Sequence, residues 1–225
     1  MESFMKKFFS MEGKFFNGMT KLANLLWLNI LMVICCIPVI TAGAAITAMY
    51  SVTLPMTRDE EGYITRSFFK AFKSNFLQAT AMWLIILAGV VVLFLDVHIL
   101  GNYLTQFIGV LLIPMCFLLL VLLALYLYAF QLQAYFKNTV KGTLGNALKL
   151  AVAHLPYTFI FMLLQIMPWI VIAKVSNPGL LVAMGWGIAG IAYICSFAYR
   201  GIFQKYEGTQ EEPEQEPEID TDDMK

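Results

Sequence analysis

The sequence predicts an all-α, polytopic membrane protein with about six membrane helices. Three observations favour this fold class. Of the 225 residues, 60% are hydrophobic and only 13% are charged, whereas about a quarter are charged in soluble domains. The apolar residues gather into five long stretches, each long enough for a hydrocarbon core of about 30 Å. Lysine and arginine concentrate in alternate loops, which is typical of cytoplasmic loops.

Residues 1–21 predict an amphipathic helix at the membrane surface. Phe4, Phe8 and Phe15 recur at helical steps, with lysines between them, and this pattern is typical of interfacial helices. Asn17 and Gly18 favour a turn before the first apolar stretch begins.

The first apolar stretch, residues 22–57, carries no charge and is interrupted at Pro38 and Gly43. As one helix it would be about 54 Å long, far longer than the hydrocarbon core. We interpret it as a broken hairpin with arms at 22–37 and 42–57, joined by the turn PVITAG. Full crossing and a re-entrant path both remain open for so short a pair.

The rest of the chain alternates cytoplasmic segments with apolar spans. After the charged turn RDEEG, an amphipathic helix rich in phenylalanine is predicted to continue directly into the next span. Further amphipathic cytoplasmic helices are expected between later spans. The predicted spans are residues 79–95, 107–132, 151–173 and 180–203. Residues 1–206 therefore form a single membrane domain, and the acidic, proline-containing residues 207–225 predict a disordered tail.

Charge asymmetry indicates the orientation. Residues 1–206 carry 14 lysines and arginines against six acids, whereas residues 207–225 carry nine acids and one lysine. The basic loops place both termini in the cytoplasm. This requires an even number of crossings before Arg58, and the hairpin supplies it. Because the lysines and arginines are explained by the cytoplasmic position of these loops, they do not indicate nucleic-acid binding. We therefore expect a lipid bilayer and no nucleic acid as partner.

Residue types needed for membrane catalysis are missing. The two histidines, His98 and His154, have no third metal ligand near in sequence, and the four cysteines lack metal-binding spacing. No HExxH, GxSxG or glycine-rich phosphate loop occurs. No ionisable residue lies in the middle of a span, where it would be a functional candidate. We therefore expect no enzymatic activity and no cofactor.

Two sets of residues are candidate functional sites. The first is a docking surface where aromatic and charged groups alternate beside the charged turn; the alternative is a solvated turn. Its residues are Arg58, Asp59, Glu60, Glu61, Phe68, Phe69 and Phe72. The second set consists of polar side chains within the spans, which either join helices by hydrogen bonds or line a solute path. Its residues are Asn29, Thr41, Gln131 and Gln165.

Two sequence segments carry a resemblance to a known family. LLWLNILMVICCIPVITAGAAITAMY and, after it, RDEEGYITRSFFKAFKSNFLQAT closely resemble the YesL-like family of small bacterial membrane proteins, whose biochemical function is unknown. The match is specific over about residues 15–85, and the remainder resembles the family only in its pattern of spans. The resemblance implies an integral membrane protein of Gram-positive-type bacteria, often encoded beside carbohydrate ABC uptake systems. It supplies no catalytic or binding residues.

These observations lead to one main hypothesis and two alternatives. The main hypothesis is a non-enzymatic accessory protein of the bacterial plasma membrane that binds ABC transporter components through the segment from Arg58 to Phe76. The first alternative is a small-solute permease or transporter subunit, for which Asn29, Thr41, Gln131 and Gln165 would have to line one cavity. The second alternative is a membrane-embedded enzyme.

Overall fold

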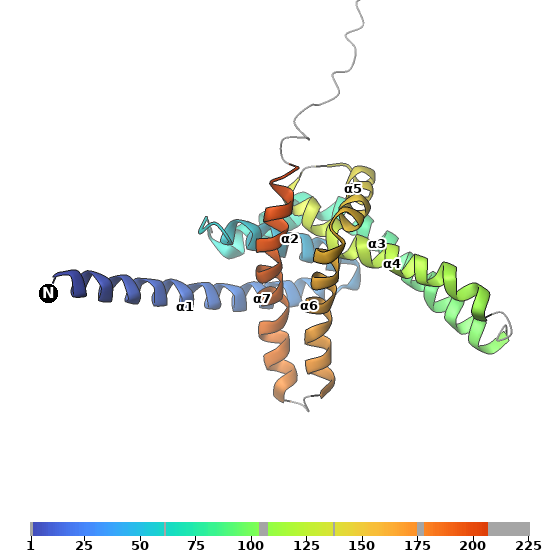
Figure 1. Ribbon diagram of the computed structural model, residues 1–225, viewed down its shortest axis with the longest axis horizontal. Coiled ribbons are helices and arrows are strands. Elements are labelled where there is room, and N and C mark those ends of the chain that lie inside the picture. The colour runs from blue at the N-terminus through green and yellow to red at the C-terminus, as the bar shows by residue number, and fades with distance from the viewer. Residues whose placement is uncertain (1, 61, 104–107, 137, 175–177, 207–225) are drawn as a thin grey trace, which may run out of the picture.

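The computed structural model describes the backbone of residues 2–60, 62–103, 108–136, 138–174 and 178–206. It describes side chains in 16–60, 62–100, 111–136, 138–166 and 188–206. All regular secondary structure in these ranges is helical, so the predicted all-α fold class is confirmed. Figure 1 shows a central group of helices from which α1 and two helical hairpins extend in different directions. The predicted acidic tail lies outside the described residues.

The helix α1 (Glu2–Cys36) is continuous through the predicted interfacial segment and the first arm of the hairpin. The expected turn at Asn17 and Gly18 is therefore wrong. A glycine inside a helix costs only about 1 kcal/mol relative to alanine, which the surrounding helical turns offset. Gly18 faces open space, since a Cβ there would meet no atom within 4 Å.

The chain reverses at Pro38. α1 ends at Cys36, and the short 3-10 helix η1 (Val39–Thr41) leads into α2 (Ala42–Met56). Pro38 has no backbone N–H and disfavours helical geometry at the preceding residue. The Thr41 hydroxyl donates to the Cys35 carbonyl at 2.6 Å and closes the turn. Farther along both arms, Lys21 forms an ion pair with Asp59, so the two segments make a helical hairpin.

The helix α2 forms the centre of the fold and contacts α1, α3, α4 and α7. Nearly all of its side chains are buried. Its small residues allow close packing: a Cβ on Gly43 would lie 2.5 Å from Trp83 Cβ and 2.6 Å from the Ala79 carbonyl oxygen. Small residues at helix interfaces serve this purpose in membrane proteins.

The helices α3 (Ile64–Tyr103) and α4 (Ile108–Tyr135) form the first extended hairpin, at the lower right of Figure 1. The prediction that the amphipathic segment continues directly into its span is confirmed, because α3 has no break between them. Toward the far end of this hairpin, large apolar side chains are exposed, among them Phe94, Ile113 and Phe117. A bilayer would cover such side chains.

The second extended hairpin follows a sharp bend. α5 (Val140–Ala153) and α6 (Leu155–Lys174) meet at 102° around His154, and α7 (Pro178–Phe203) runs back alongside α6. The predicted span 151–173 is divided by this bend, because residues 151–153 end α5 and α6 begins at Leu155. Pro156 explains the break: it lacks the N–H that would continue the α5 hydrogen bonds.

An aromatic cluster joins four helices at the centre. The fully buried Tyr199 ring of α7 lies 4.1 Å from Phe161 of α6, 5.7 Å from Tyr128 of α4 and 5.9 Å from Tyr50 of α2, measured between ring centroids. The Tyr199 hydroxyl donates to the Leu127 carbonyl at 2.6 Å. Edge-to-face aromatic pairs contribute about 0.5–1.5 kcal/mol each beyond area burial, so this cluster fixes how α7 packs on the other helices.

The described helices have the length and composition of a polytopic membrane protein. Within those residues, four helical segments are long and apolar enough to cross a bilayer, or five if the bent pair of α5 and α6 counts as one span. The apolar helix of residues 188–203 is shorter than a full span in its described part. The described residues therefore supply four or five of the predicted six or so membrane helices.

Candidate functional site

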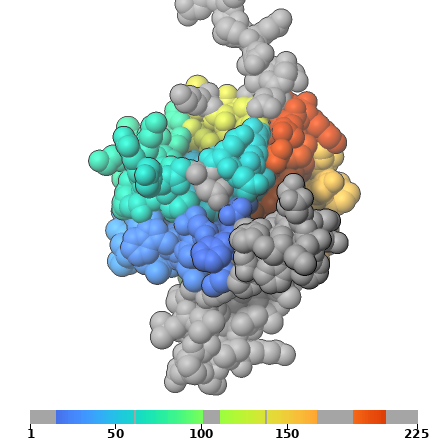
Figure 2. Space-filling model, turned by 90° about the vertical axis from the view of Figure 1, so that its left-hand side faces the viewer, coloured from blue at the N-terminus to red at the C-terminus, as the bar shows by residue number. Residues whose placement is uncertain are grey.

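Two adjoining cavities lie where α2, α4 and α7 end. Figure 2 shows the turn between α2 and α3 (cyan) beside the C-terminal end of α7 (red) on one face of the molecule. We name the smaller cavity, of about 260 Å³, the arginine cavity; it is lined by Ser51, Leu54, Pro55, Arg58, Glu60, Ala134, Tyr135 and Arg200. We name the larger one, of about 640 Å³, the polar groove; it is lined by Ser51, Ser67, Lys70, Ala71, Ser74, Asn75, Gln78, Gln133, Ala134, Tyr135, Phe136, Asn138 and Thr139.

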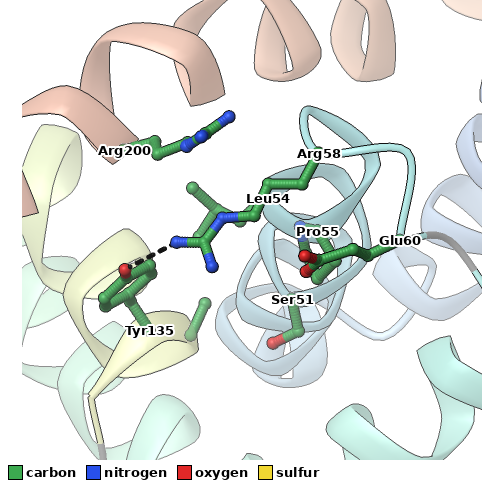
Figure 3. A pocket seen from close by; sticks show the side chains of 8 residues that line it. Ser51, Leu54, Pro55, Arg58, Glu60, Tyr135 and Arg200 are labelled. Carbon is green, nitrogen blue, oxygen red and sulfur yellow. Dashed lines mark hydrogen bonds between the residues drawn. The ribbon is translucent and has the colours of Figure 1, made fainter. Parts of the chain in front are cut away.

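Two arginine side chains from distant parts of the sequence face the arginine cavity. Arg58 lies in the turn after α2, and Arg200 lies in the last turn of α7. Figure 3 shows Arg58 reaching toward Tyr135, with Glu60 and Ser51 on the α2 side of the cavity. Arg58 Nη2 donates to Tyr135 Oη at 3.1 Å, and Arg200 Nη1 donates to the Thr57 carbonyl at 3.3 Å. Each guanidinium has five N–H donors, so donors remain for a ligand.

The arginine cavity has a positive charge balance. Among the described residues, neither Arg58 nor Arg200 forms an ion pair with a carboxylate within 4.0 Å. Glu60 lines the same cavity without reaching that distance. Among the described residues, two cations and one anion thus line the cavity, which favours an anionic occupant.

The polar groove is organised by Gln133 of α4, which is 3% exposed. Its Nε2 donates to Gln78 Oε1 and, at 3.4 Å, to Asn75 Oδ1, both on α3. Its Oε1 accepts from the fully buried Thr143 hydroxyl of α5 at 2.9 Å. One side chain therefore joins α3, α4 and α5. Apart from Lys70, the polar groups that line the groove are uncharged hydroxyls and amides.

The turn between α2 and α3 has a defined conformation. Asp59 has φ of 59°, in the left-handed region that Asp and Asn tolerate better than most residues. Its carboxylate pairs with Lys21. Trp27 Nε1 of α1 donates to the Thr65 hydroxyl of α3 at 2.8 Å. These contacts hold the turn against α1, and thereby position Arg58 and Glu60 at the arginine cavity.

The predicted docking residues fall into two groups. Arg58, Asp59, Glu60 and Phe69 are exposed, and Phe72 is half-buried. Phe68 is fully buried in the core and stacks on Phe72 at 6.2 Å between centroids. Phe68 therefore cannot belong to a docking surface, because residue 68 lies on the face of α3 that packs inward. Glu61 lies outside the described residues.

The predicted intramembrane polar residues line neither the arginine cavity nor the polar groove. Asn29 is buried, and its Oδ1 accepts from the Ala189 backbone N–H of α7 at 3.3 Å. Thr41 closes the turn after Pro38. Gln165 Nε2 donates to the Tyr50 hydroxyl at 3.5 Å, whereas the buried Gln131 Oε1 has no hydrogen-bond partner among the described residues. The bonds of Asn29 and Gln165 join helices to one another, as interhelical hydrogen bonds do in membrane proteins.

Sequence reasoning missed Tyr135, Gln133 and Ser51 as site residues, and it used Arg200 only as an indicator of topology. Tyr135 and Gln133 lie at the polar end of an apolar span, where such residues commonly mark the membrane interface. The available signal was the clustering of Gln, Asn, Tyr and basic residues at the ends of several spans. This clustering does not predict which span ends lie together in the folded protein.

Two further cavities are smaller and more apolar. One of about 250 Å³ lies between α3 and α4 and is lined by Asp96, Ile99, Leu100, Leu111, Pro114, Met115 and Leu118. The other, of about 210 Å³, lies beside α5 and is lined by Leu132, Phe136, Asn146, Lys149, Leu150, Ala153 and Tyr206. Over the described residues, no three His, Cys, Asp or Glu side chains are grouped to hold a metal ion.

A family model described as a protein of unknown function, DUF624, matches residues 22–97. The matched segment contains the second half of α1, all of α2, the turn with Arg58 and most of α3. Tyr135 and Arg200 lie outside it. No curated protein and no solved structure matches the chain. The similarity is therefore to an uncharacterised family, and it covers only the part of the site that α2 and α3 supply.

Proposed function

We propose that the protein is a non-enzymatic accessory component of a carbohydrate ABC uptake system in the bacterial plasma membrane. Both termini and the turn between α2 and α3 face the cytoplasm in this proposal. The observation that carries it is an exposed surface of mixed aromatic and charged character around this turn. We define this docking surface as Arg58, Asp59, Glu60, Tyr63 and Phe69, all exposed.

The composition of the docking surface supports a protein partner. Tyr63 is 85% exposed and Phe69 is 40% exposed, although aromatic side chains of this size are usually buried at least in part. Arginine and aromatic residues are enriched at protein interfaces and dominate their binding energy. The turn beneath is held by the contacts of Lys21 and Trp27, so its side chains are preorganised, which lowers the entropic cost of association.

The carbohydrate ABC system as partner rests on the resemblance to the YesL-like family described above. The permease alternative has less support, because Asn29, Thr41 and Gln165 form hydrogen bonds in three separate parts of the fold. A transporter that works alone would still produce solute uptake in liposomes containing only this protein, and that measurement distinguishes the two functions.

Co-purification tests the proposal. A tagged full-length chain is solubilised from native bacterial membranes in a mild detergent, and the associated proteins are quantified by mass spectrometry. We expect subunits of a carbohydrate ABC system to be enriched. The double substitution Tyr63→Ser with Phe69→Ser should reduce their recovery by about fivefold or more, since aromatic interface residues commonly contribute more than 1 kcal/mol each.

Phe16→Ser is the matched control, because Phe16 is an aromatic residue that is 74% exposed on α1, outside the docking surface. Its recovery of ABC subunits should equal that of the unsubstituted chain. Absence of any ABC subunit, or an equal loss with Phe16→Ser, would contradict the proposal.

A further inference from the structure

We propose that Arg58, Arg200 and Tyr135 form a binding site for a phosphate group, with the rest of the ligand in the adjoining polar groove. This inference concerns a small ligand and goes beyond the docking of a protein partner. It rests on the arginine cavity, where two guanidinium groups from α7 and the α2–α3 turn face one space.

The two guanidiniums have the properties of an anion site. Neither has a carboxylate partner within ion-pair distance among the described residues, yet each is held in place by one hydrogen bond to a neutral group, the Tyr135 hydroxyl or the Thr57 carbonyl. A positioned arginine with free donors favours planar, multidentate contacts to phosphate oxygens. The terminal oxygens of a phosphate group can accept hydrogen bonds from both arginines at once.

The chemistry of the neighbouring space indicates what the phosphate carries. Ser51, Ala134 and Tyr135 line both the arginine cavity and the polar groove. The groove presents hydroxyl and amide groups, which exchange hydrogen bonds with ligand hydroxyls. On the opposite side of the cavity, the Glu60 carboxylate accepts hydrogen bonds and would repel a second anionic group. The ligand class is therefore a phosphate ester with a small hydroxylated moiety.

Two sources supply this chemistry. One is a soluble phosphate ester, and the other is the phosphoglycerol headgroup of an anionic lipid, which is present at the ends of membrane spans. The two probes are glycerol 3-phosphate, a phosphate monoester, and phosphatidylglycerol, a phosphate diester; both present a phosphate joined to a glycerol that carries hydroxyl groups. The full-length protein is reconstituted in phosphatidylcholine nanodiscs, and binding of glycerol 3-phosphate is measured by the shift in thermal unfolding. Lipid binding is measured by native mass spectrometry with phosphatidylglycerol added.

Arg200→Gln removes one guanidinium without altering the docking surface. We expect it to weaken binding of the responding probe by about tenfold or more, since a hydrogen bond to a charged group contributes about 1.5–3 kcal/mol. Arg200→Lys should recover part of this affinity. Lys205→Gln is the matched control, because the exposed Lys205 lies near the end of α7 but does not line the cavity. It should change affinity less than twofold.

Tyr135→Phe provides a second variant that keeps the ring, which packs on Phe203 at 5.3 Å between centroids. It removes only the hydroxyl that holds Arg58, and it should weaken binding about threefold to tenfold. A response to either probe that depends on Arg200 and Tyr135 supports the site and identifies the source. No response to either probe, or an equal loss with Lys205→Gln, would overturn it. Recovery of ABC subunits is a separate measurement, so the failure of one proposal can be distinguished from the failure of the other.

Discussion

Lys21 and Asp59 form an ion pair that joins α1 to the turn after α2. Lys21 Nζ also donates to the Met56 carbonyl at 3.4 Å. The pair places the beginning of the first hairpin arm beside the end of the second, with Pro38 at the opposite end. The two charged ends of the hairpin thus lie together. The distribution of basic residues predicts that both ends face the cytoplasm, and this arrangement agrees with that prediction.

This arrangement predicts the result of cysteine labelling. In a variant whose four native cysteines are replaced, Thr20→Cys and Glu60→Cys should both react with a membrane-impermeant maleimide from the cytoplasmic side only, since both positions are exposed at the same end of the hairpin. Ile40→Cys, at the turn, should show no cytoplasmic labelling. Labelling of positions 20 and 60 from opposite sides of the membrane would contradict the hairpin.

Substitution of Gly43 should destabilise the fold. A Cβ at this position would lie 2.5 Å from Trp83 Cβ and 2.6 Å from the Ala79 carbonyl, so α2 and α3 must separate. We expect Gly43→Ala to lower the free energy of unfolding by about 1–3 kcal/mol, measured by denaturant titration in detergent. Gly18→Ala is the control, because it meets no atom within 4 Å and should be neutral or stabilising by up to about 1 kcal/mol. Equal effects at both positions would refute the close packing.

Gln133→Leu should also destabilise the protein, since it leaves the fully buried Thr143 hydroxyl without its acceptor. An unsatisfied buried polar group costs about 1–3 kcal/mol. Gln78→Ala is the comparison, because Gln78 is exposed and solvent can replace its bond to Gln133, so we expect a loss below about 1 kcal/mol. If thermal unfolding in detergent shows the two variants to be equally stable, Gln133 does not join the helices.

The phenylalanines of α3 should separate into structural and surface residues. Phe68→Ser should lower the free energy of unfolding by about 3–5 kcal/mol, because it removes a fully buried ring and buries a hydroxyl. Phe69→Ser should lower it by less than about 1 kcal/mol, since Phe69 is substantially exposed. The stability of the two variants is compared by size-exclusion chromatography of detergent-solubilised protein after heating. An unchanged monodisperse profile for Phe68→Ser would contradict the position of Phe68 in the core.

Much of the fold was accessible from the sequence. Pro38 ends a helix through the chemistry of its own ring, and the charged turn at Arg58 separates two apolar stretches, so both boundaries follow from local residues. The error at Gly18 came from treating a weak local preference as a break. The bend between α5 and α6 was not predicted, although Pro156 supplied a signal for a new helix. Phe68 and Phe69 differ by about 100° around a helix, so periodicity alone separates their faces.

Most helices and their order follow from the sequence, because hydrophobic length, proline and charge act over neighbouring residues. The tertiary structure alone decided that Arg58 and Arg200 share a cavity with Tyr135. That meeting depends on the packing of α2 against α4 and α7, and therefore on contacts such as Thr53 with Ser196 at 2.9 Å and the ring of Tyr199 on Tyr50. Such contacts join residues far apart along the chain. They depend on how side-chain shapes fit together, and no periodicity or motif in the sequence predicts which residues pair.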